Sequence, residues 1–542
     1  MKSVIVASLG LLTALTPLAQ AESKRPNIVL FLADDLGYGN IGCYDQPDFH
    51  TPNVDDLAAR GLKFTDAHSA TAVCQPTRYA ILAGRWYWRS MWGRYQSGIY
   101  FQENEILLPQ VLKDAGYSTA MFGKWHLGFG PRKGREEQPD WNAELKPGPN
   151  ECGFDYWFGM PNAHNMPPFV FIENHHVYKH DPADPIVMHS KEEAKEKNIP
   201  QATGWGASSG AKAAHEACPR DRIDLIVGER AAAWLSQQKP DKPFFLYLPF
   251  FAPHAPVVPA EEFLGKSPMA KRLKKNTNAT RTADVVQQMD HAIGMVMTAL
   301  KEKGMLDNTL VVFSSDNGNI NLGDNQAIGF RTNGPFNGNK GDIWEGGHRV
   351  PLVVSWPGHI PEGKTCDKFI SLIDLYRTFL AAADIPLPEG AAPDGLNMLS
   401  LWEHPDTGEG RKIKSYRGKG NALRVGDWVY VPPAEVPNTK PVKFVSQGAG
   451  GHAEGGGGPA VKLGYTNSDF DENGKLKPDA PLEQLYNLRN DPSQTTNLFH
   501  TEKERLAALQ KIQQSIKTSK KNTPLEDLLK TLTPEESSLL GI

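Results

Sequence analysis

Cysteine is scarce in this 542-residue chain, and charge of one sign is not in excess. The five cysteines are scattered without a CxxC pair, so a dense disulfide framework is excluded. A net charge of −4 excludes the broad basic surface of a nucleic-acid-binding protein. Any anion that the protein handles must therefore be bound locally. An odd count leaves at least one cysteine unpaired, and pairing among Cys43, Cys152, Cys218 and Cys366 stays open.

The N-terminus has the pattern of a secretory signal peptide, which we assign to residues 1–21. A basic start at Lys2 precedes an apolar run from Val4 to Leu18, and the segment Ala19–Ala21 has small residues at a cleavage site. The apolar run is too short for a permanent membrane span, and no later segment has the pattern of one. No cysteine follows the cleavage site, so no lipid anchor is expected. We expect a periplasmic or secreted protein without a stable membrane anchor.

Apolar strand-like runs alternate with helical patterns over most of the chain, which predicts an α/β protein with a large, mostly parallel central sheet. The run 27–33 is continuously apolar after its first residue, as in a strand covered on both faces. The sequence pattern changes after Trp402, where short strands such as 427–431 and an amphipathic helix at 502–516 follow a polar, turn-rich segment. We predict a catalytic domain at residues 22–404 and a smaller C-terminal α+β domain at 405–542.

Polar side chains follow four of the predicted strands. They are Asp34 and Asp35, Lys124 and His126, His254, and Asp316 with Asn317. Ligands of open α/β sheets bind beyond the carboxyl ends of the strands. Turn chemistry explains one Asp pair but not four such strand ends. The sequence therefore predicts one site at this edge.

The segment Val73–Arg78 reads VCQPTR and contains a C-x-P-[ST]-R core, followed by LAGR at 82–85. On these residues the chain resembles the formylglycine-dependent type I sulfatases of the alkaline phosphatase-like superfamily. The resemblance runs from Pro26 to about Leu401 and returns at 485–488. The segment 154–178 is similar to the arylsulfatase and galactosamine-6-sulfatase branch. The resemblance implies a large parallel sheet flanked by helices, with an antiparallel sheet in the C-terminal domain.

The resemblance implies that Cys74 is oxidised to formylglycine (3-oxoalanine) by a formylglycine-generating or sulfatase-maturating enzyme. The hydrated aldehyde is a gem-diol, one oxygen of which attacks sulfur and expels the alcohol. Loss of the proton of the second hydroxyl then releases sulfate and restores the aldehyde. Pro76 suits the first turn of a helix, so residue 74 is expected at a helix N-terminus, where anions are favoured. By resemblance, Arg78 holds the diol.

The resemblance also implies a metal site made by Asp34, Asp35, Asp316 and Asn317, completed by an oxygen of residue 74. These hard oxygen donors suit calcium or magnesium rather than zinc. Four protein ligands at a flexible site favour one Ca²⁺ per chain over Mg²⁺.

Three further segments carry expected site residues. Residues 123–128 read GKWHLG and match a family motif in which Lys124 binds sulfate and His126 takes the proton that triggers release of sulfate. By the same resemblance His254 is the general acid for the departing alcohol, and Lys340 is a second sulfate-binding lysine. We assign His348 no role.

Export, aromatic residues and the resemblance favour a sulfated carbohydrate as substrate. Two groups are candidates for a sugar-binding cleft: the aromatic-rich stretch Trp86, Tyr87, Trp88, Met91 and Trp92, and the loop histidines His164, His175 and His176. One alternative is a formylglycine-dependent phosphodiester or phosphonate monoester hydrolase. The other is a glycan-binding protein without catalysis, against which the complete set of site residues argues. The sequence leaves the sugar and the sulfate position open.

Overall fold

The computed structural model describes residues 25–90, 98–131, 139–199, 207–320, 329–416, 422–433, 466–473, 476–519 and 523–542. The predicted signal peptide, Met91 and Trp92 lie outside these residues. Within the described part of the chain, no helix is both long and apolar enough to cross a membrane.

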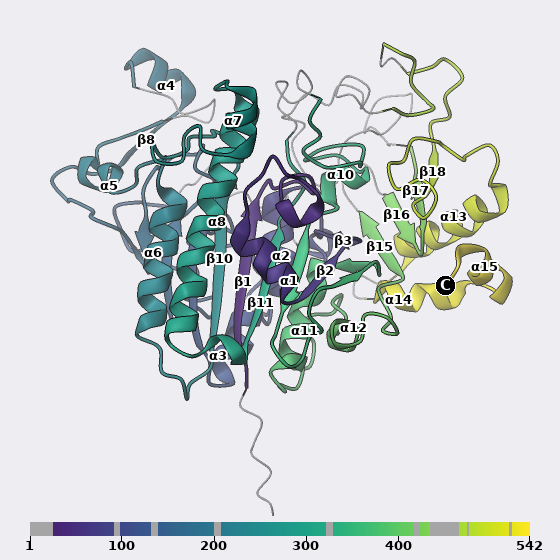
Figure 1. Ribbon diagram of the computed structural model, residues 1–542, viewed down its shortest axis with the longest axis horizontal. Coiled ribbons are helices and arrows are strands. Elements are labelled where there is room, and N and C mark those ends of the chain that lie inside the picture. Colours follow the sequence, from purple (N-terminus) through teal and green to yellow (C-terminus); the bar gives the residue numbers. More distant parts are fainter. Residues whose placement is uncertain are drawn as a thin grey trace, which may run out of the picture.

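A ten-stranded sheet forms the centre of the molecule (Figure 1). In spatial order its strands are β13 (Lys364–Cys366), β2 (Leu62–Phe64), β12 (Leu352–Ser355), β11 (Thr309–Ser315), β1 (Asn27–Asp34), β10 (Phe244–Pro253), β4 (Ser118–Lys124), β5 (Tyr156–Met160), β6 (Ile172–Glu173) and β7 (His176–Val177). The five strands from β11 to β5 are mutually parallel, and β12 is antiparallel to β11. The predicted mostly parallel sheet is confirmed.

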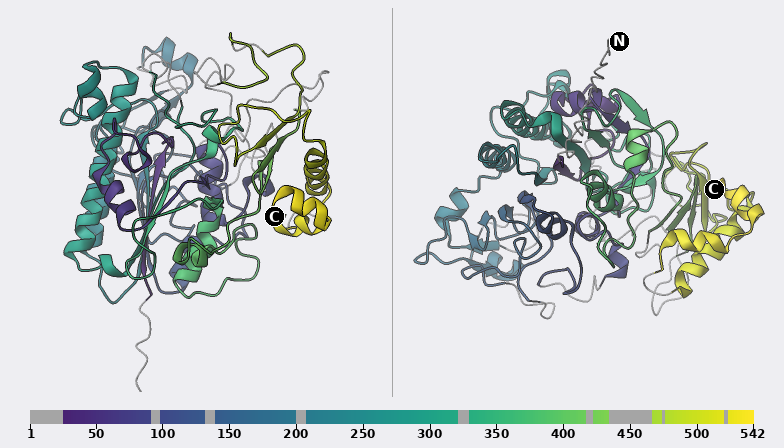
Figure 2. Two further views of the ribbon diagram at one scale, coloured as in Figure 1. Left: turned by 45° about the vertical axis from the view of Figure 1, so that its right-hand side comes forward. Right: turned by 90° about the horizontal axis from the view of Figure 1, so that it is seen from below.

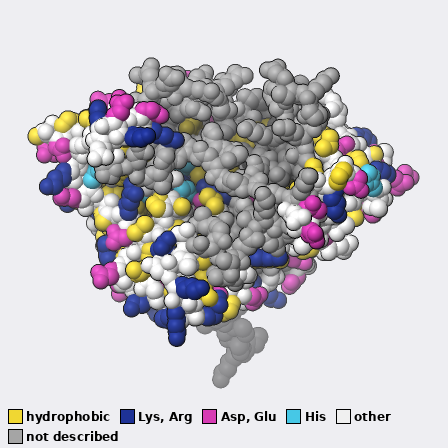
Figure 3. Space-filling view, turned by 90° about the horizontal axis from the view of Figure 1, so that it is seen from above, with side chains coloured by type: hydrophobic (Ala, Val, Ile, Leu, Met, Phe, Trp, Pro, Cys, Tyr) yellow, Lys and Arg dark blue, Asp and Glu magenta, His cyan; other side chains and the backbone are white. Residues whose placement is uncertain are grey.

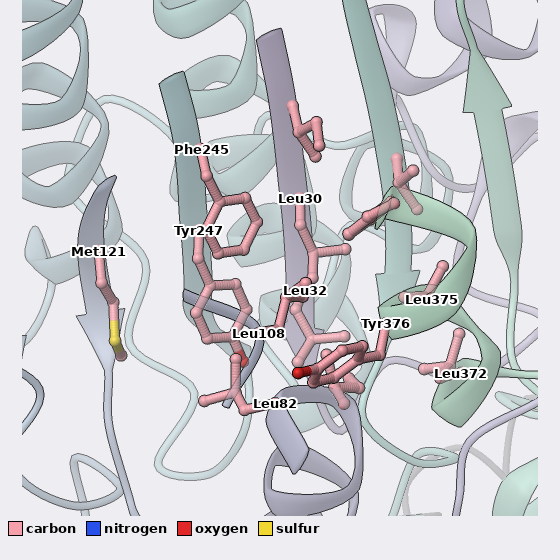
Figure 4. Close-up of a cluster of buried hydrophobic side chains, with 14 of the residues drawn as sticks. Leu30, Leu32, Leu82, Leu108, Met121, Phe245, Tyr247, Leu372, Leu375 and Tyr376 are labelled. Atoms are coloured by element: carbon pink, nitrogen blue, oxygen red, sulfur yellow. The ribbon is translucent and has the colours of Figure 1, made fainter. Parts of the chain in front are cut away.

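Strand β1 is buried along its whole length because helices cover both faces of the sheet. Leu30 and Leu32 pack on one side, whereas Val29 and Phe31 pack on the other, as the period of two in a strand requires. Figure 4 shows the first side, where side chains of β1 and β10 meet those of α2 and α11. That face is covered by α2 (Cys74–Ala83), α3 (Leu108–Asp114) and α11 (Leu375–Ala382); the opposite face by α1 (Pro52–Ala59), α6 (Ile223–Ser236) and α8 (Asn278–Glu302).

A small C-terminal unit packs beside the large sheet, as Figure 2 shows in two further views. Its antiparallel sheet has the strands β15 (Ile413–Tyr416), β16 (Ala422–Val425), β17 (Trp428–Val431) and β18 (Gln484–Asn487). Its helices are α13 (Lys503–Thr518), α14 (Leu525–Leu528) and α15 (Pro534–Leu540). The expected antiparallel C-terminal sheet is confirmed.

Shorter elements complete the described structure. Two strand pairs stand apart from the large sheet: β3 (Ala67–His68) with β14 (Ile370–Ser371), and β8 (Val187–His189) with β9 (Ala207–Ser209). The short helices are α4 (Lys191–Glu196), α5 (Lys212–Glu216), α7 (Pro268–Leu273), α10 (Glu345–His348) and α12 (Leu399–Glu403). Helix α8 begins at Asn278, where Thr277 and Thr280 form a capping box.

Candidate active site

The carboxyl ends of β1, β4, β10 and β11 meet at one edge of the sheet, at the top of Figure 1. Figure 3 looks down on this edge, and histidine side chains are visible near its centre. Hydrogen bonds and ion pairs link side chains from all four strand ends, Cys74 and Lys340. The sequence-predicted site residues therefore gather in one place.

Cys74 is the first residue of α2, and its side chain is buried. The backbone of Val73 before it is extended, so the helix begins at Cys74 and its first N–H groups lie around this residue. Burial raises the pKa of the Cys74 thiol, although Lys124 and Lys340 oppose the shift. The unmodified thiol is thus neutral and a poor nucleophile.

Three cations and three carboxylates alternate around Cys74. Lys124 Nζ lies 2.6 Å from Asp34 Oδ2, and Lys340 Nζ lies 2.7 Å from Asp35 Oδ1. Arg78 donates from Nε and Nη2 to Asp316 Oδ2 at 2.9 and 2.7 Å. The cations can hold the anionic oxygens of a sulfate group, while the carboxylates need positive charge nearby.

The carboxylate side of this cluster fits a metal ion. Asp34 Oδ1 and Asn317 Oδ1 are buried without a hydrogen-bond partner, and such orphaned acceptors are costly unless something binds them. Asp34, Cys74 and Asp316 each offer a ligand atom within 4.8 Å of the others, and so do Asp34, Asp35 and His254. Burial and the negative charge of Asp34 raise the pKa of Asp316. A divalent cation bound between the two carboxylates would offset their repulsion and favour the ionised form of Asp316. The oxygen-rich set suits a hard cation.

Two histidines flank the cluster. His126 Nδ1 lies 3.4 Å from Cys74 Sγ, and His254 Nε2 lies 3.7 Å from Asp35 Oδ2. Burial, together with Lys124 and Arg78, holds the pKa of His126 well below its usual value, so His126 is neutral and can accept a proton. Burial also lowers the pKa of His254, but the carboxylates of Asp35 and Asp34 oppose that shift.

Two motif glycines stand where a side chain does not fit. A Cβ on Gly123 would lie 2.0 Å from the Pro249 carbonyl oxygen of the neighbouring strand β10. Gly84 ends α2 with a φ of +56°, and a Cβ there would lie 2.3 Å from that of Ala392. These glycines let the strand carrying Lys124 and the helix carrying Cys74 approach their neighbours closely.

The structure corrects part of the predicted sugar cleft. Trp86 is fully buried in the core that joins α2 to the C-terminal sheet, so it cannot line a cleft. His175 lies 3.0 Å from Glu151, and His176 is exposed on β7. Of the three loop histidines only His164 reaches the site, where its ring packs at 90° against His254.

Sequence reasoning missed Asp224, which supports the strand end that carries His254. From helix α6 its carboxylate accepts the N–H groups of Phe251 and Ala252 at 2.8 and 2.9 Å. An acidic residue in the first turn of a helix is common, so no local signal sets it apart.

A second buried cluster lies between the large sheet and the C-terminal unit. His68 Nδ1 and His348 Nδ1 are 3.0 Å apart, and Glu345 completes a triad with ligand-like spacing. Arg424 Nη1 lies 2.9 Å from His68 Nε2, so positive charge already fills this cluster. We therefore interpret this cluster as a structural junction.

None of the five cysteines forms a disulfide.

Comparisons with known proteins agree with this geometry. A family model described as Sulfatase matches residues 26–385. An N-acetylgalactosamine-6-O-sulfatase of Bacteroides thetaiotaomicron is 30% identical over 531 residues, covering 92% of this chain and 94% of that protein. The N-acetylgalactosamine-6-sulfatase of Homo sapiens is 33% identical over 403 residues, covering 70% of this chain and 66% of the human protein.

Solved structures show the same architecture. One from work on glycosaminoglycan metabolism by Bacteroides thetaiotaomicron has a TM-score of 0.74 and 29% identity, and the match covers 92% of this chain and 100% of that one. The phosphonate monoester hydrolase of Agrobacterium radiobacter has a TM-score of 0.54 and 17% identity over 91% of this chain and 95% of its own. The latter likeness concerns the fold alone.

Proposed function

Because the chain belongs to the sulfatase family of sulfuric ester hydrolases, we propose that it removes sulfate from a sulfated carbohydrate. One observation carries the proposal: Cys74 lies at a helix N-terminus among Arg78, Lys124 and Lys340. This arrangement suits a tetrahedral anion next to a nucleophile. N-acetylgalactosamine 6-sulfate is the first substrate to test, because relatives that match most of the chain are named for it.

The proposed nucleophile is residue 74 after oxidation of its thiol to an aldehyde by a maturating enzyme. One hydroxyl of the hydrated aldehyde loses its proton to solvent, its oxygen attacks sulfur, and the bond from sulfur to the sugar oxygen breaks. The second hydroxyl then gives up its proton, the carbonyl reforms and sulfate leaves. Water adds to the aldehyde to restore the diol. Arg78 holds the diol and stabilises the negative charge that develops on its oxygens.

Acid and base roles divide between the two histidines. Neutral His126, beside residue 74, takes the proton of the second hydroxyl. His254 gives a proton to the departing sugar oxygen, and the negative charge of bound sulfate raises its pKa and so favours its protonated form. Lys124 and Lys340 hold sulfate oxygens, and ion pairs with carboxylates of the cluster already position both lysines.

We further propose one calcium ion per chain, held by Asp34, Asp35, Asp316 and Asn317 with an oxygen of residue 74. When bound, it polarises a sulfate oxygen and favours the ionised diol. Four hard oxygen donors at and just beyond strand ends suit the flexible coordination of calcium better than the strict octahedron of magnesium.

Export to the periplasm or the medium is part of the proposal and rests on the leader-like residues 1–21. A phosphonate or phosphodiester hydrolase on the same fold is the rival enzyme. A non-catalytic glycan-binding protein has no need of the nucleophile or of the histidine beside it.

The test uses protein made with a maturating enzyme present. We expect mass spectrometry to find an aldehyde at residue 74 and elemental analysis to find one calcium ion per chain. The variants Asp35→Ala and Asp316→Ala should each lose both the calcium and the activity. N-acetylgalactosamine 6-sulfate should be turned over far faster than a phosphate diester. Preference for the diester would contradict the sulfated-sugar assignment, and full activity with an unmodified thiol would contradict the mechanism.

A further inference from the structure

A small, partly open cavity adjoins the candidate active site at the carboxyl end of β10, and residues of α6 and α8 contribute to its lining. It is lined by His164, Arg220, Asp224, His254, Val257 and Gln288, among others. His254, the proposed acid for the leaving sugar oxygen, belongs to both the site and the cavity. The cavity therefore lies where the sugar can extend from the scissile bond.

Arg220 brings a positive charge to this cavity without a carboxylate to balance it. Its guanidinium stacks over the ring of Phe169 at 4.1 Å. Among the described residues, no carboxylate lies within ion-pair distance of it, whereas nearby Arg222 lies 2.6 Å from Glu262. Half-burial lowers the pKa of Arg220, which means that its charge is poorly solvated. A guanidinium that is held in place by an aromatic ring and is poorly solvated binds an anionic ligand favourably.

His164 contributes a second polar group without a hydrogen-bond partner in the cavity. Its Nε2 is buried and has no hydrogen-bond partner, although the residue lines the same cavity. Burial and the nearby His254 lower its pKa to about 3, so the ring is neutral. Nε2 of the neutral ring is therefore available for a hydrogen bond with a ligand hydroxyl.

Asp224 also lines the cavity, but it does not neutralise Arg220. Both of its oxygens accept backbone N–H groups, those of Phe251 and Ala252. Burial raises the pKa of Asp224 to about 7, which reduces its negative charge near neutral pH. The electrostatic character of the cavity is set by Arg220.

We infer that Arg220 and His164 form a subsite for a second anionic group of the glycan, either a carboxylate on a neighbouring uronate or a second sulfate. Arg220 binds the anionic oxygens through its planar pair of N–H donors, and His164 accepts from a sugar hydroxyl. The inference rests on the proposed function, since it presumes that a sulfated glycan occupies the active site.

Binding can be measured without turnover in the calcium-loaded Cys74→Ser protein by calorimetry. Three probes separate the possibilities: N-acetylgalactosamine 6-sulfate, its 4,6-disulfate, and a disaccharide of a uronate with N-acetylgalactosamine 6-sulfate. Charge-assisted hydrogen bonds of this kind change affinity by about 10–100-fold. We expect Arg220→Gln to weaken binding of one or both doubly charged probes by that factor and binding of the monosulfate by less than about twofold.

Arg220→Lys keeps the charge and should lose less affinity than Arg220→Gln, and Arg222→Gln is the matched control because Arg222 is already paired. Loss with the disulfate alone assigns a sulfate, and loss with the disaccharide alone assigns a carboxylate. Equal effects of Arg220→Gln on all three probes would overturn the subsite and leave the proposed function standing. Failure of every probe to bind the parent protein would overturn both.

Discussion

At the scale of single residues, the two site histidines differ in what they face. His126 is within 3.4 Å of the nucleophile position, whereas His254 faces Asp35 and His164. In the proposed mechanism, every substrate needs a proton acceptor for the second hydroxyl, because release of sulfate from the enzyme is common to all. A proton donor is needed only where the leaving oxygen is strongly basic.

We therefore predict that His254→Ala slows desulfation of a sugar far more than desulfation of nitrophenyl sulfate. A sugar alkoxide must be protonated as its bond breaks, and a nitrophenolate leaves without help. General acid catalysis contributes about 10²–10⁴-fold where it is needed. The measurement is kcat/KM for both substrates.

His126→Ala should slow both substrates and let the sulfated enzyme accumulate, which intact mass spectrometry detects. His175→Ala, which removes a histidine paired with Glu151, is the control and should change neither rate. Equal effects of His254→Ala on sugar and nitrophenyl substrates would instead make His254 a sulfate-binding residue.

At the scale of elements, helix α6 supports the end of β10. Asp224 receives the N–H groups of Phe251 and Ala252, so it fixes the backbone two and three residues before His254. The carboxylate is nearly isosteric with an amide, but the amide replaces one of the two acceptor oxygens with an NH2 donor group. One backbone N–H then loses its partner.

We predict that Asp224→Asn lowers kcat/KM for a sulfated sugar by about tenfold, because an unsatisfied buried group costs about 1–3 kcal/mol and displaces the strand end. As a positioning effect on His254, the loss should be smaller with nitrophenyl sulfate. Glu229→Gln, on an exposed part of the same helix, is the matched control. An equal loss with both substrates would show a general structural defect instead.

At the scale of the whole molecule, a buried ion pair joins the large sheet to the C-terminal sheet. Arg424 on β16 donates to both oxygens of Asp66 at 2.6 and 2.9 Å, and Arg349 approaches the same carboxylate at 3.6 Å. Burial opposes the charge of Asp66, but Arg349 and Arg424 outweigh it and hold its pKa well below the usual value. Unfolding exposes this carboxylate and returns its pKa to normal.

We predict that Asp66→Asn destabilises the protein by about 3–5 kcal/mol at pH 7, since it leaves Arg424 buried without its partner. Because the pKa is depressed in the folded state, this stabilisation is present above about pH 4 and is lost as the pH falls below it. Thermal unfolding from pH 7 to pH 3 should show the gap between the two proteins narrowing.

The control for that junction is Asp427→Asn, which breaks the exposed pair of Asp427 with Arg489 and should cost less than about 1 kcal/mol. If Asp66→Asn proved equally mild, the junction would not hold the two sheets together.

The sequence alone determined the architecture and predicted which side chains gather at one edge of the sheet. Apolar runs alternating with helical patterns predicted the parallel sheet, and the carboxyl ends of such strands share one edge. Asp34, Lys124, His254 and Asp316 could therefore be placed together before any coordinates, although up to 282 residues separate them. The C-x-P-[ST]-R core singled out Cys74 as the proposed nucleophile, because a local motif needs no tertiary information.

Tertiary structure alone decided what surrounds that cluster. Trp86 lies in an aromatic stretch, yet packing against the C-terminal sheet buries it. Asp66 and Arg424 stand 358 residues apart without a local pattern. Arg220 and His164 line one cavity because the segment before α6 and the loop before β6 converge on the end of β10. Burial and pairing depend on which distant surfaces meet, and periodicity reports only which face of an element is apolar.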